Sequence, residues 1–233
     1  MHGSVGARPG IRNRAAAPGT RAIPFRGDAW RVIVDAPGRG VVSSGSMQTL
    51  NILGICGSFR LKSYNMMALR TAGALMLPGM SFRVVSYDDI PLYSQDLQDR
   101  GFPAPVLRLK ADIEAADGIL FASPEYNHSV AGVLKNAIDW LSRFPDQPFK
   151  FKPVAVLSAT QGPLGGARNQ YELRKIMNCL EAIPLARPEI FIGNVQTKFD
   201  GEGRLTDEST RKIMTEQMTA FRGWILRLQK GAA

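Results

Sequence analysis

The sequence predicts an α/β protein with a five-stranded, doubly wound parallel sheet. From residue 48 onward, apolar segments typical of strands alternate with segments of helical character, and this alternation indicates βα units. The strand segments are continuously apolar, as expected when helices cover both faces of a sheet. Several loops that follow strands are rich in Gly, Pro, Ser and Asn. Because ligands of such sheets bind at the carboxyl ends of the strands, we expect the functional site at these loops.

Each predicted element rests on its composition and on its flanking residues. The strands are short apolar runs, whereas the helices carry apolar residues at helical spacing. Asp207 precedes the last helix and is suited to be its N-cap. The predicted strands span residues 51–55, 81–87, 118–122, 153–158 and 189–192. The predicted helices span residues 64–77, 105–116, 131–141, 166–183 and 207–228. Right-handed crossovers between these units give an open sheet between two layers of helices.

The domain organisation follows from length and composition. The chain has 233 residues, of which 45% are hydrophobic, so it can bury one sizeable core. We expect one domain over residues 47–233. Residues 1–46 are rich in Gly, Pro, Arg and Ala, and we expect this leader to be disordered or to belong to an over-long start, because Met47 opens a natural first strand. An Arg-rich transit peptide is the alternative, but so much Gly and Pro opposes an amphipathic helix.

The net charge of +9 would suit a nucleic-acid binder. However, residues 1–46 hold seven of the 29 Lys and Arg residues but two of the 20 Asp and Glu residues, so the leader carries more than half of the excess. We therefore expect no nucleic-acid partner. The apolar runs fall far short of the roughly 20 residues that span a bilayer, which predicts no membrane partner. Two Cys and two His residues predict neither a metal site nor a disulfide framework, and a reducing cytoplasm fits this pattern.

The loop after the first strand, residues 57–65, has the features of a phosphate site. Ser58, Ser63 and Asn65 offer small donors, Arg60 offers a forked cation, and the helix that begins near Tyr64 adds its amide ends. This set suits a terminal phosphate monoester. The loop lacks the G-x-G-x-x-G pattern that binds a pyrophosphate and the Gly-Lys-Ser/Thr ending that binds a nucleotide triphosphate.

A phosphatase is an alternative use of the same loop. Low-molecular-weight protein tyrosine phosphatases place a Cys-x5-Arg-Ser/Thr loop after the first strand, and the cysteine is the nucleophile. Here Cys56 ends the first strand, but the sixth residue after it is Lys62, and Arg60 comes two positions too early. Asp146 is the candidate for the general acid. Cys56 is therefore better interpreted as a small core residue.

Two further loops would reach the same edge of the sheet. After the third strand, Pro124 fixes the chain direction, Tyr126 offers a flat face and the neighbouring amides are available to a polar heterocycle. His128 has no carboxylate near it in sequence except Glu125. After the fourth strand, a glycine-rich loop lets backbone approach something flat. Together, the three loops predict a flat ligand with a terminal phosphate.

These motifs resemble those of the NADPH-dependent FMN reductase family, within which the similarity is greatest to the chromate, quinone and azo-dye reductase branch. The resemblance covers roughly residues 49–193 and is carried by the combination of motifs. They are Gly-Ser-Phe-Arg-x-x-Ser-x-Asn from Gly57, Ser-Pro-Glu-Tyr-Asn from Ser123, residues 132–142, and Gly-Gly-Ala-Arg from Gly165.

The resemblance implies a flavodoxin-like three-layer fold with tightly bound FMN. It assigns the FMN phosphate to Ser58, Arg60, Ser63 and Asn65, with Tyr64 supplying backbone and Lys62 nearby charge. It places Pro124, Glu125, Tyr126 and Asn127 along the isoalloxazine ring and ribityl chain. It brings Gly162, Gly165 and Gly166 to the pyrimidine end of the ring.

The resemblance also implies an assembly and an activity. Residues 89–93 would rim the flavin pocket of a neighbouring subunit in a homodimer or homotetramer, with contacts over residues 135–143 and 168–171. NADPH or NADH would reduce FMN, leave, and be replaced by a small acceptor such as a quinone, an azo dye or chromate, in a ping-pong cycle. No dedicated acid, base or nucleophile is required. A flavin shuttle that docks to partner proteins is the other alternative, but the acidic face and Thr-rich phosphate loop typical of such proteins are missing.

Overall fold

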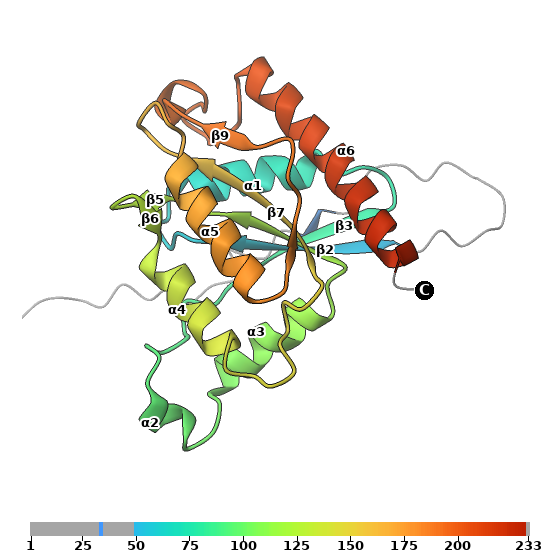
Figure 1. Cartoon of the computed structure of the whole chain (residues 1–233). Coiled ribbons are helices and arrows are strands. Elements are labelled where there is room, and N and C mark those ends of the chain that lie inside the picture. The colour runs from blue at the N-terminus through green and yellow to red at the C-terminus, as the bar shows by residue number, and fades with distance from the viewer. Residues whose placement is uncertain (1–32, 35–48, 232–233) are drawn as a thin grey trace, which may run out of the picture.

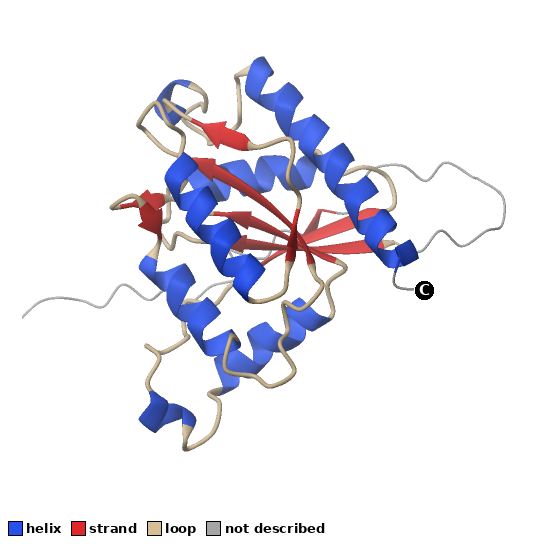
Figure 2. Cartoon of the chain, in the orientation of Figure 1, coloured by secondary structure: helices blue, strands red, loops and turns tan. Residues whose placement is uncertain are grey.

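A computed structural model describes residues 33–34 and 49–231 of the chain. Its central layer is a parallel sheet in which the strands lie in the order β3 (Met80–Val85), β2 (Leu50–Cys56), β4 (Gly118–Ala122) and β7 (Pro153–Ala159). Two short strands, β8 (Ile183–Pro184) and β9 (Ile190–Ile192), complete the parallel sheet beside β7. Figures 1 and 2 show this sheet between layers of helices. The flavodoxin-like α/β fold predicted from the sequence is thus confirmed.

The fifth strand differs from its prediction because the chain forms it in two pieces. β8 pairs with the first two residues of β7, and β9 pairs with the last three. Pro184 and Pro188 have no backbone N–H to donate, so an uninterrupted hydrogen-bonded ladder cannot run through both. A further strand, β1 (Ile33–Val34), pairs antiparallel with β3 at the opposite edge. It lies inside the predicted leader, and the rest of that prediction falls outside the described residues.

The five predicted helices are all present, with ends that shift by a few residues. They are α1 (Tyr64–Ala74), α3 (Ala104–Glu114), α4 (Gly132–Leu141), α5 (Ala167–Cys179) and α6 (Glu208–Gly231). Asp207 caps α6 as predicted, because its Oδ1 accepts the Thr210 N–H at 2.8 Å. The structure adds four short elements: α2 (Gln95–Gln98), the hairpin strands β5 (Glu125–Tyr126) and β6 (Ser129–Val130), and a 3₁₀ turn, Val195–Thr197.

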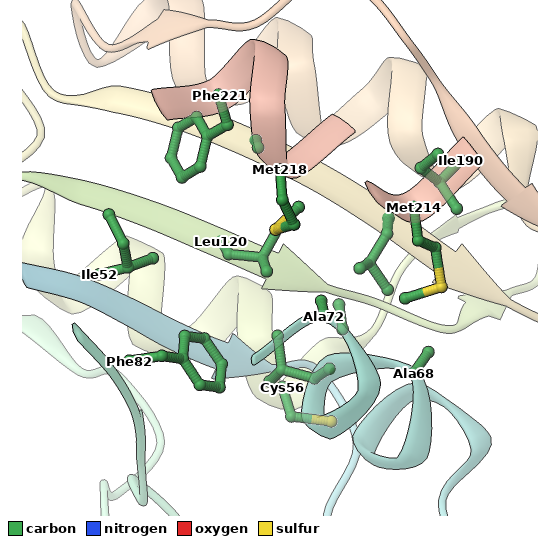
Figure 3. Close-up of a cluster of buried hydrophobic side chains, with 14 of the residues drawn as sticks. Ile52, Cys56, Ala68, Ala72, Phe82, Leu120, Ile190, Met214, Met218 and Phe221 are labelled. Atoms are coloured by element: carbon green, nitrogen blue, oxygen red, sulfur yellow. The ribbon is translucent and has the colours of Figure 1, made fainter. Parts of the chain in front are cut away.

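Each face of the sheet has its own hydrophobic core. One core packs α1 and α6 against the sheet, and the other packs α3, α4 and α5 against the opposite face. In the first core, Phe82 of β3 faces α1, while Met214, Met218 and Phe221 approach from α6 (Figure 3). A Cβ at Gly73 of α1 would lie 2.4 Å from the Phe82 ring, so a helical glycine makes room for the aromatic side chain.

Among the helices in the described part of the chain, none combines the length and the apolar character needed to cross a membrane.

Candidate functional site

The carboxyl ends of β2, β4 and β7 bring the three predicted loops together at one edge of the sheet. The arrowheads of these strands point toward the β5–β6 hairpin, on the side opposite the C-terminal end of α6 (Figures 1 and 2). Backbone hydrogen bonds join the start of a loop to the neighbouring strand: the Gly57 N–H donates to the Ala122 carbonyl of β4 at 2.8 Å, and the Ser123 N–H donates to the Leu157 carbonyl of β7 at 3.2 Å. The prediction that these three loops meet at one edge of the sheet is therefore confirmed.

The loop after β2 forms a cradle at the N-terminus of α1. Ser63 caps the helix, since its Oγ accepts the Met66 N–H at 3.3 Å, and Ser58 Oγ accepts the Arg60 N–H at 3.4 Å. Both serines are buried. The backbone amides of Tyr64 and Asn65 donate to no acceptor in the described residues, so the positive end of the helix dipole stays open to an anion.

Two cations flank this cradle. Arg60 and Lys62 are exposed, and within the described part of the chain neither side chain makes a hydrogen bond or an ion pair. Asn65 is different. It is 3% exposed, and its amide joins both backbone groups of Ala159: Nδ2 donates to the carbonyl at 2.8 Å and Oδ1 accepts the N–H at 3.0 Å. Asn65 therefore fastens the cradle to the end of β7.

The loop after β4 is tied to the N-terminus of α5 by the Glu125 carboxylate. Its Oε2 accepts the backbone N–H groups of Arg168 at 3.0 Å and Asn169 at 3.2 Å, and its Oε1 accepts from the Arg168 guanidinium at 3.3 Å. Asn169 adds a second link, because its Nδ2 donates to the Ser123 carbonyl at 2.9 Å. A carboxylate already occupies the first turn of α5, where it interacts favourably with the helix dipole.

The predicted Pro-Glu-Tyr-Asn loop is a tight hairpin. Asn127 and His128, with φ of 51° and 64°, form the two-residue connection between β5 and β6, as in a type I′ turn. Tyr126 is 52% exposed, so its ring is available to a ligand or to another protein surface. The signal for this hairpin in the sequence is weak, because type I′ turns usually carry glycine at the second position, where this chain has His128.

The glycines of the loop after β7 serve two different purposes. Gly165 and Gly166 have φ of +60° and +85°. A Cβ at Gly165 would lie 2.5 Å from the Phe191 carbonyl carbon, and one at Gly166 would lie 2.8 Å from Ser158 Cβ. Both glycines are therefore required by the packing of the protein itself. A Cβ at Gly162 would meet nothing within 4 Å, so Gly162 leaves open space beside the backbone.

Cys56 does not have the environment of a nucleophile. It is buried, its thiol donates to the Ser58 carbonyl at 3.5 Å, and burial raises the pKa of the thiol to about 11. The adjoining cavity, which Cys56, Phe59 and Tyr87 help to line, measures about 20 Å³, enough for roughly one water molecule. Asp146 forms an ion pair with Lys110 of α3 at 2.9 Å. Because a catalytic cysteine must be a thiolate, these features do not support the phosphatase alternative.

These features define a class of protein: a flavodoxin-like α/β protein whose sheet edge holds an anion cradle, a polar hairpin and a glycine loop. The residues fit a flat cofactor with one terminal phosphate. The N-terminus of α1 offers open amides, and the loop before it offers two cations that are unpaired within the described residues, whereas α5 is closed by Glu125.

Comparisons with known proteins identify the family. Residues 50–197 match the sequence profile of NADPH-dependent FMN reductases, and the chain belongs to this family. It is 48% identical to an NAD(P)H-dependent FMN reductase of Pseudomonas aeruginosa, over 77% of this chain and 97% of that protein. It is 43% identical to a quinone reductase of Escherichia coli, over 78% of this chain and 98% of that protein.

A solved structure agrees with this assignment. The flavoenzyme NAD(P)H:(acceptor) oxidoreductase FerB of Paracoccus denitrificans superposes with a TM-score of 0.70 at 33% identity, and the match covers 76% of this chain and 98% of that one. The chain is therefore an oxidoreductase of the FMN reductase and quinone reductase type, and the prediction of FMN and NAD(P)H as cofactor and electron donor is confirmed.

Proposed function

We propose that this protein passes two electrons from NAD(P)H through FMN to quinones in a ping-pong cycle. The observation that carries the proposal is the contrast between two helix ends at one edge of the sheet. Within the described residues, α1 keeps two free amides beside unpaired Arg60 and Lys62, whereas Glu125 closes α5. The names of the relatives from Escherichia coli and from Solanum tuberosum, a quinone reductase and an NAD(P)H:quinone oxidoreductase, support quinones as acceptors. Azo dyes and chromate are further acceptors that we propose for the same site.

The proposed cofactor site uses the residues of the three loops in distinct ways. The side chains of Ser58, Arg60 and Ser63 and the backbone of Tyr64 would hold the FMN phosphate, with Lys62 as additional charge. Asn65, whose amide is bonded to Ala159, would keep this cradle in place. The hairpin and glycine-loop residues would contact the rest of the cofactor, and they are Pro124, Glu125, Tyr126, Asn127, Gly162, Gly165 and Gly166.

Bound FMN would supply the redox chemistry by accepting a hydride and passing on two electrons. The protein would contribute binding, orientation and electrostatics. Loop amides near the ring would stabilise negative charge on it, and the bonds from Asn65 and Asn169 would fix the loops relative to one another. The described residues around the cradle offer no thiolate, because the pKa of Cys56 is raised, and the proposed reaction needs none.

We further propose a homodimer or homotetramer in the cytoplasm. Pro91 is held against α4, since Asn136 Nδ2 and Trp140 Nε1 donate to its carbonyl at 2.9 and 2.8 Å. The adjacent Leu92 side chain is 82% exposed. A partner subunit on this segment would bury the Leu92 side chain, and this burial would favour assembly. Sedimentation velocity tests this proposal, and a monomer at micromolar concentration would refute it.

Spectroscopy of the purified protein tests the activity. We expect flavin absorbance that NADPH bleaches under nitrogen and that a quinone restores, with parallel double-reciprocal plots for donor and acceptor. Cys56→Ser should leave NADPH oxidation almost unchanged and serves as the control for the phosphatase alternative. A colourless protein that neither binds added FMN nor oxidises NADPH would refute the proposal. Intersecting plots would refute the ping-pong order alone.

A further inference from the structure

A second cavity lies at the opposite edge of the sheet from the candidate flavin site. It measures about 620 Å³ and is formed by the end of α3, the loop before β7, the start of β8 and the last turns of α6. This volume lies within the roughly 300–1,000 Å³ typical of small-molecule sites. Strand β7 separates the two edges by seven residues, which corresponds to roughly 20 Å at the usual rise per residue. The cavity is therefore a separate site.

Hydrogen bonds between distant segments hold the walls of this cavity in place. Lys152 Nζ donates to the carbonyls of Glu114 at 2.8 Å and Ala116 at 2.5 Å, which fixes the end of α3 to the start of β7. The Asp117 carboxylate accepts from Gln229 of α6 at 3.1 Å and from the Asn51 N–H at 2.7 Å. Because these bonds link α3, β7, α6 and β2, the cavity exists before any ligand binds.

Phe151 lines the cavity in a conformation that its own contacts do not explain. Its φ of 59° lies in the left-handed region, which is unfavourable for a bulky aromatic residue. The ring is 65% exposed, so burial of the ring offsets little of this cost. The backbone is held by the Phe151 N–H bond to the Glu181 carbonyl at 2.8 Å, and a Lys150–Glu181 ion pair at 2.9 Å lies beside it. A glycine could make the same backbone bond without strain. Strain that persists at an exposed position is often associated with ligand binding.

The chemistry of the cavity combines apolar surface with positive charge. Pro153, Ile183 and Leu228 contribute apolar wall beside Phe151. Arg227 is exposed and has no partner in the described part of the chain. Three of the charged side chains that line the cavity are cations, Lys150, Lys152 and Arg227, and two are carboxylates, Glu114 and Asp117. The charge of the lining is therefore positive on balance.

We infer that this cavity binds a small planar aromatic anion, which stacks on the Phe151 ring and places its carboxylate or sulfonate against the Arg227 guanidinium. Aromatic stacking and a charge-assisted hydrogen bond supply the two recognition elements. Lys150, whose Nζ lies 5.3 Å from the centre of the Phe151 ring, is held in an ion pair with Glu181, so Arg227 is the cation assigned to the ligand.

Calorimetric titration of the full-length protein, saturated with FMN, tests the site with 2-naphthoate as the probe. We expect saturable binding that leaves the flavin absorbance unchanged. Phe151→Gly should weaken binding by about tenfold through loss of stacking, and its thermal unfolding midpoint should be unchanged or higher. Arg227→Gln should weaken binding by about tenfold through loss of the charged partner. The control, Lys212→Gln, changes an exposed residue of α6 outside the cavity and should bind as the unaltered protein does.

Three results would overturn the inference. The first is an absence of saturable binding. The second is binding that perturbs the flavin spectrum and survives both cavity substitutions, since the probe would then occupy the flavin site. The third is a lower unfolding midpoint for Phe151→Gly, because the aromatic ring would then serve the fold. None of these readouts depends on NADPH oxidation.

Discussion

The N-termini of α1 and α5 lie at the same edge of the sheet and follow loops of similar composition. They differ in whether their first-turn N–H groups already have acceptors within the protein. At α1, Ser63 accepts the Met66 N–H, and the amides of Tyr64 and Asn65 have no acceptor in the described residues. At α5, the Glu125 carboxylate accepts two first-turn amides and the Arg168 guanidinium. Both helix ends carry the same dipole. The difference shows that the dipole alone does not make a helix N-terminus available to an anion. The fold must also leave backbone N–H groups of the first turn without an acceptor.

The largest effect should come from the loop that leads into α5. Gly165→Ala places a Cβ 2.5 Å from the Phe191 carbonyl carbon at a φ of +60°, so we expect a loss of about 2–4 kcal/mol in the free energy of unfolding. Chemical denaturation measures this loss. Gly162→Ala is the matched control in the same loop, because its Cβ meets nothing within 4 Å, and its change should stay within about 0.5 kcal/mol. Equal effects of the two substitutions would contradict the assignment of Gly165 to packing.

Removing the cation beside α1 should weaken cofactor binding with little effect on stability. Arg60 is exposed and unpaired in the described residues. We expect Arg60→Ala to cost about 1.5–3 kcal/mol of FMN binding through loss of a charge-assisted bond. Fluorescence titration of the apoprotein with FMN measures this cost. Arg100→Ala changes another exposed arginine without a partner in the described chain and should leave the affinity unchanged. Unchanged affinity in Arg60→Ala would show that the cradle does not hold the phosphate.

Removing the carboxylate that closes α5 should lower the stability of the fold and have a smaller effect on cofactor binding. Glu125→Ala leaves two first-turn amides without their acceptor, so we expect a loss of about 1–2 kcal/mol in unfolding free energy. Glu125→Gln keeps one acceptor oxygen and should lose less. FMN affinity should change less in either variant than in Arg60→Ala. A large loss of FMN affinity with normal stability would show instead that Glu125 acts mainly on the cofactor.

The cradle at α1 could be predicted from the sequence, whereas the closure of α5 by Glu125 could not. The cradle at α1 is local: Ser58, Arg60 and Ser63 lie within six residues, and their spacing carries the signal. The closure of α5 joins Glu125 to Arg168, 43 residues away, and the bond from Asn65 reaches Ala159, 94 residues away. A local pattern cannot reveal which distant donor a side chain will meet. The strands and helices were predictable because burial imposes its pattern on each segment separately: a continuous apolar run on each strand and a helical spacing of apolar residues on each helix.

The N-terminus of α6 can be compared with that of α5, because it is also closed by a carboxylate, but here the carboxylate belongs to the neighbouring residue Asp207. Hydrogen bonds from the Thr210 hydroxyl, the Ser209 hydroxyl and the Thr210 N–H lower the pKa of Asp207 from 3.8 to about 2. A carboxyl group with a lowered pKa in the folded state stabilises the protein above its unfolded-state pKa, and this contribution disappears as the pH falls through the folded-state value. We therefore expect Asp207→Asn to reduce the unfolding free energy at pH 7 by only about 0.3–1 kcal/mol, because asparagine is also a good N-cap and mainly the charge is lost.

The pH dependence separates the charge of Asp207 from its geometry as a cap. The difference in unfolding free energy between the unaltered protein and Asp207→Asn should be constant above about pH 5 and should vanish between about pH 4 and pH 2. Urea denaturation at a series of pH values measures it. In Asp207→Ala the cap itself is lost, so part of the destabilisation should persist at pH 2. A difference between unaltered protein and Asp207→Asn that grows on acidification would contradict the lowered pKa. The N-terminus of α6 could then no longer be compared with that of α5 as a helix end closed by a charged carboxylate.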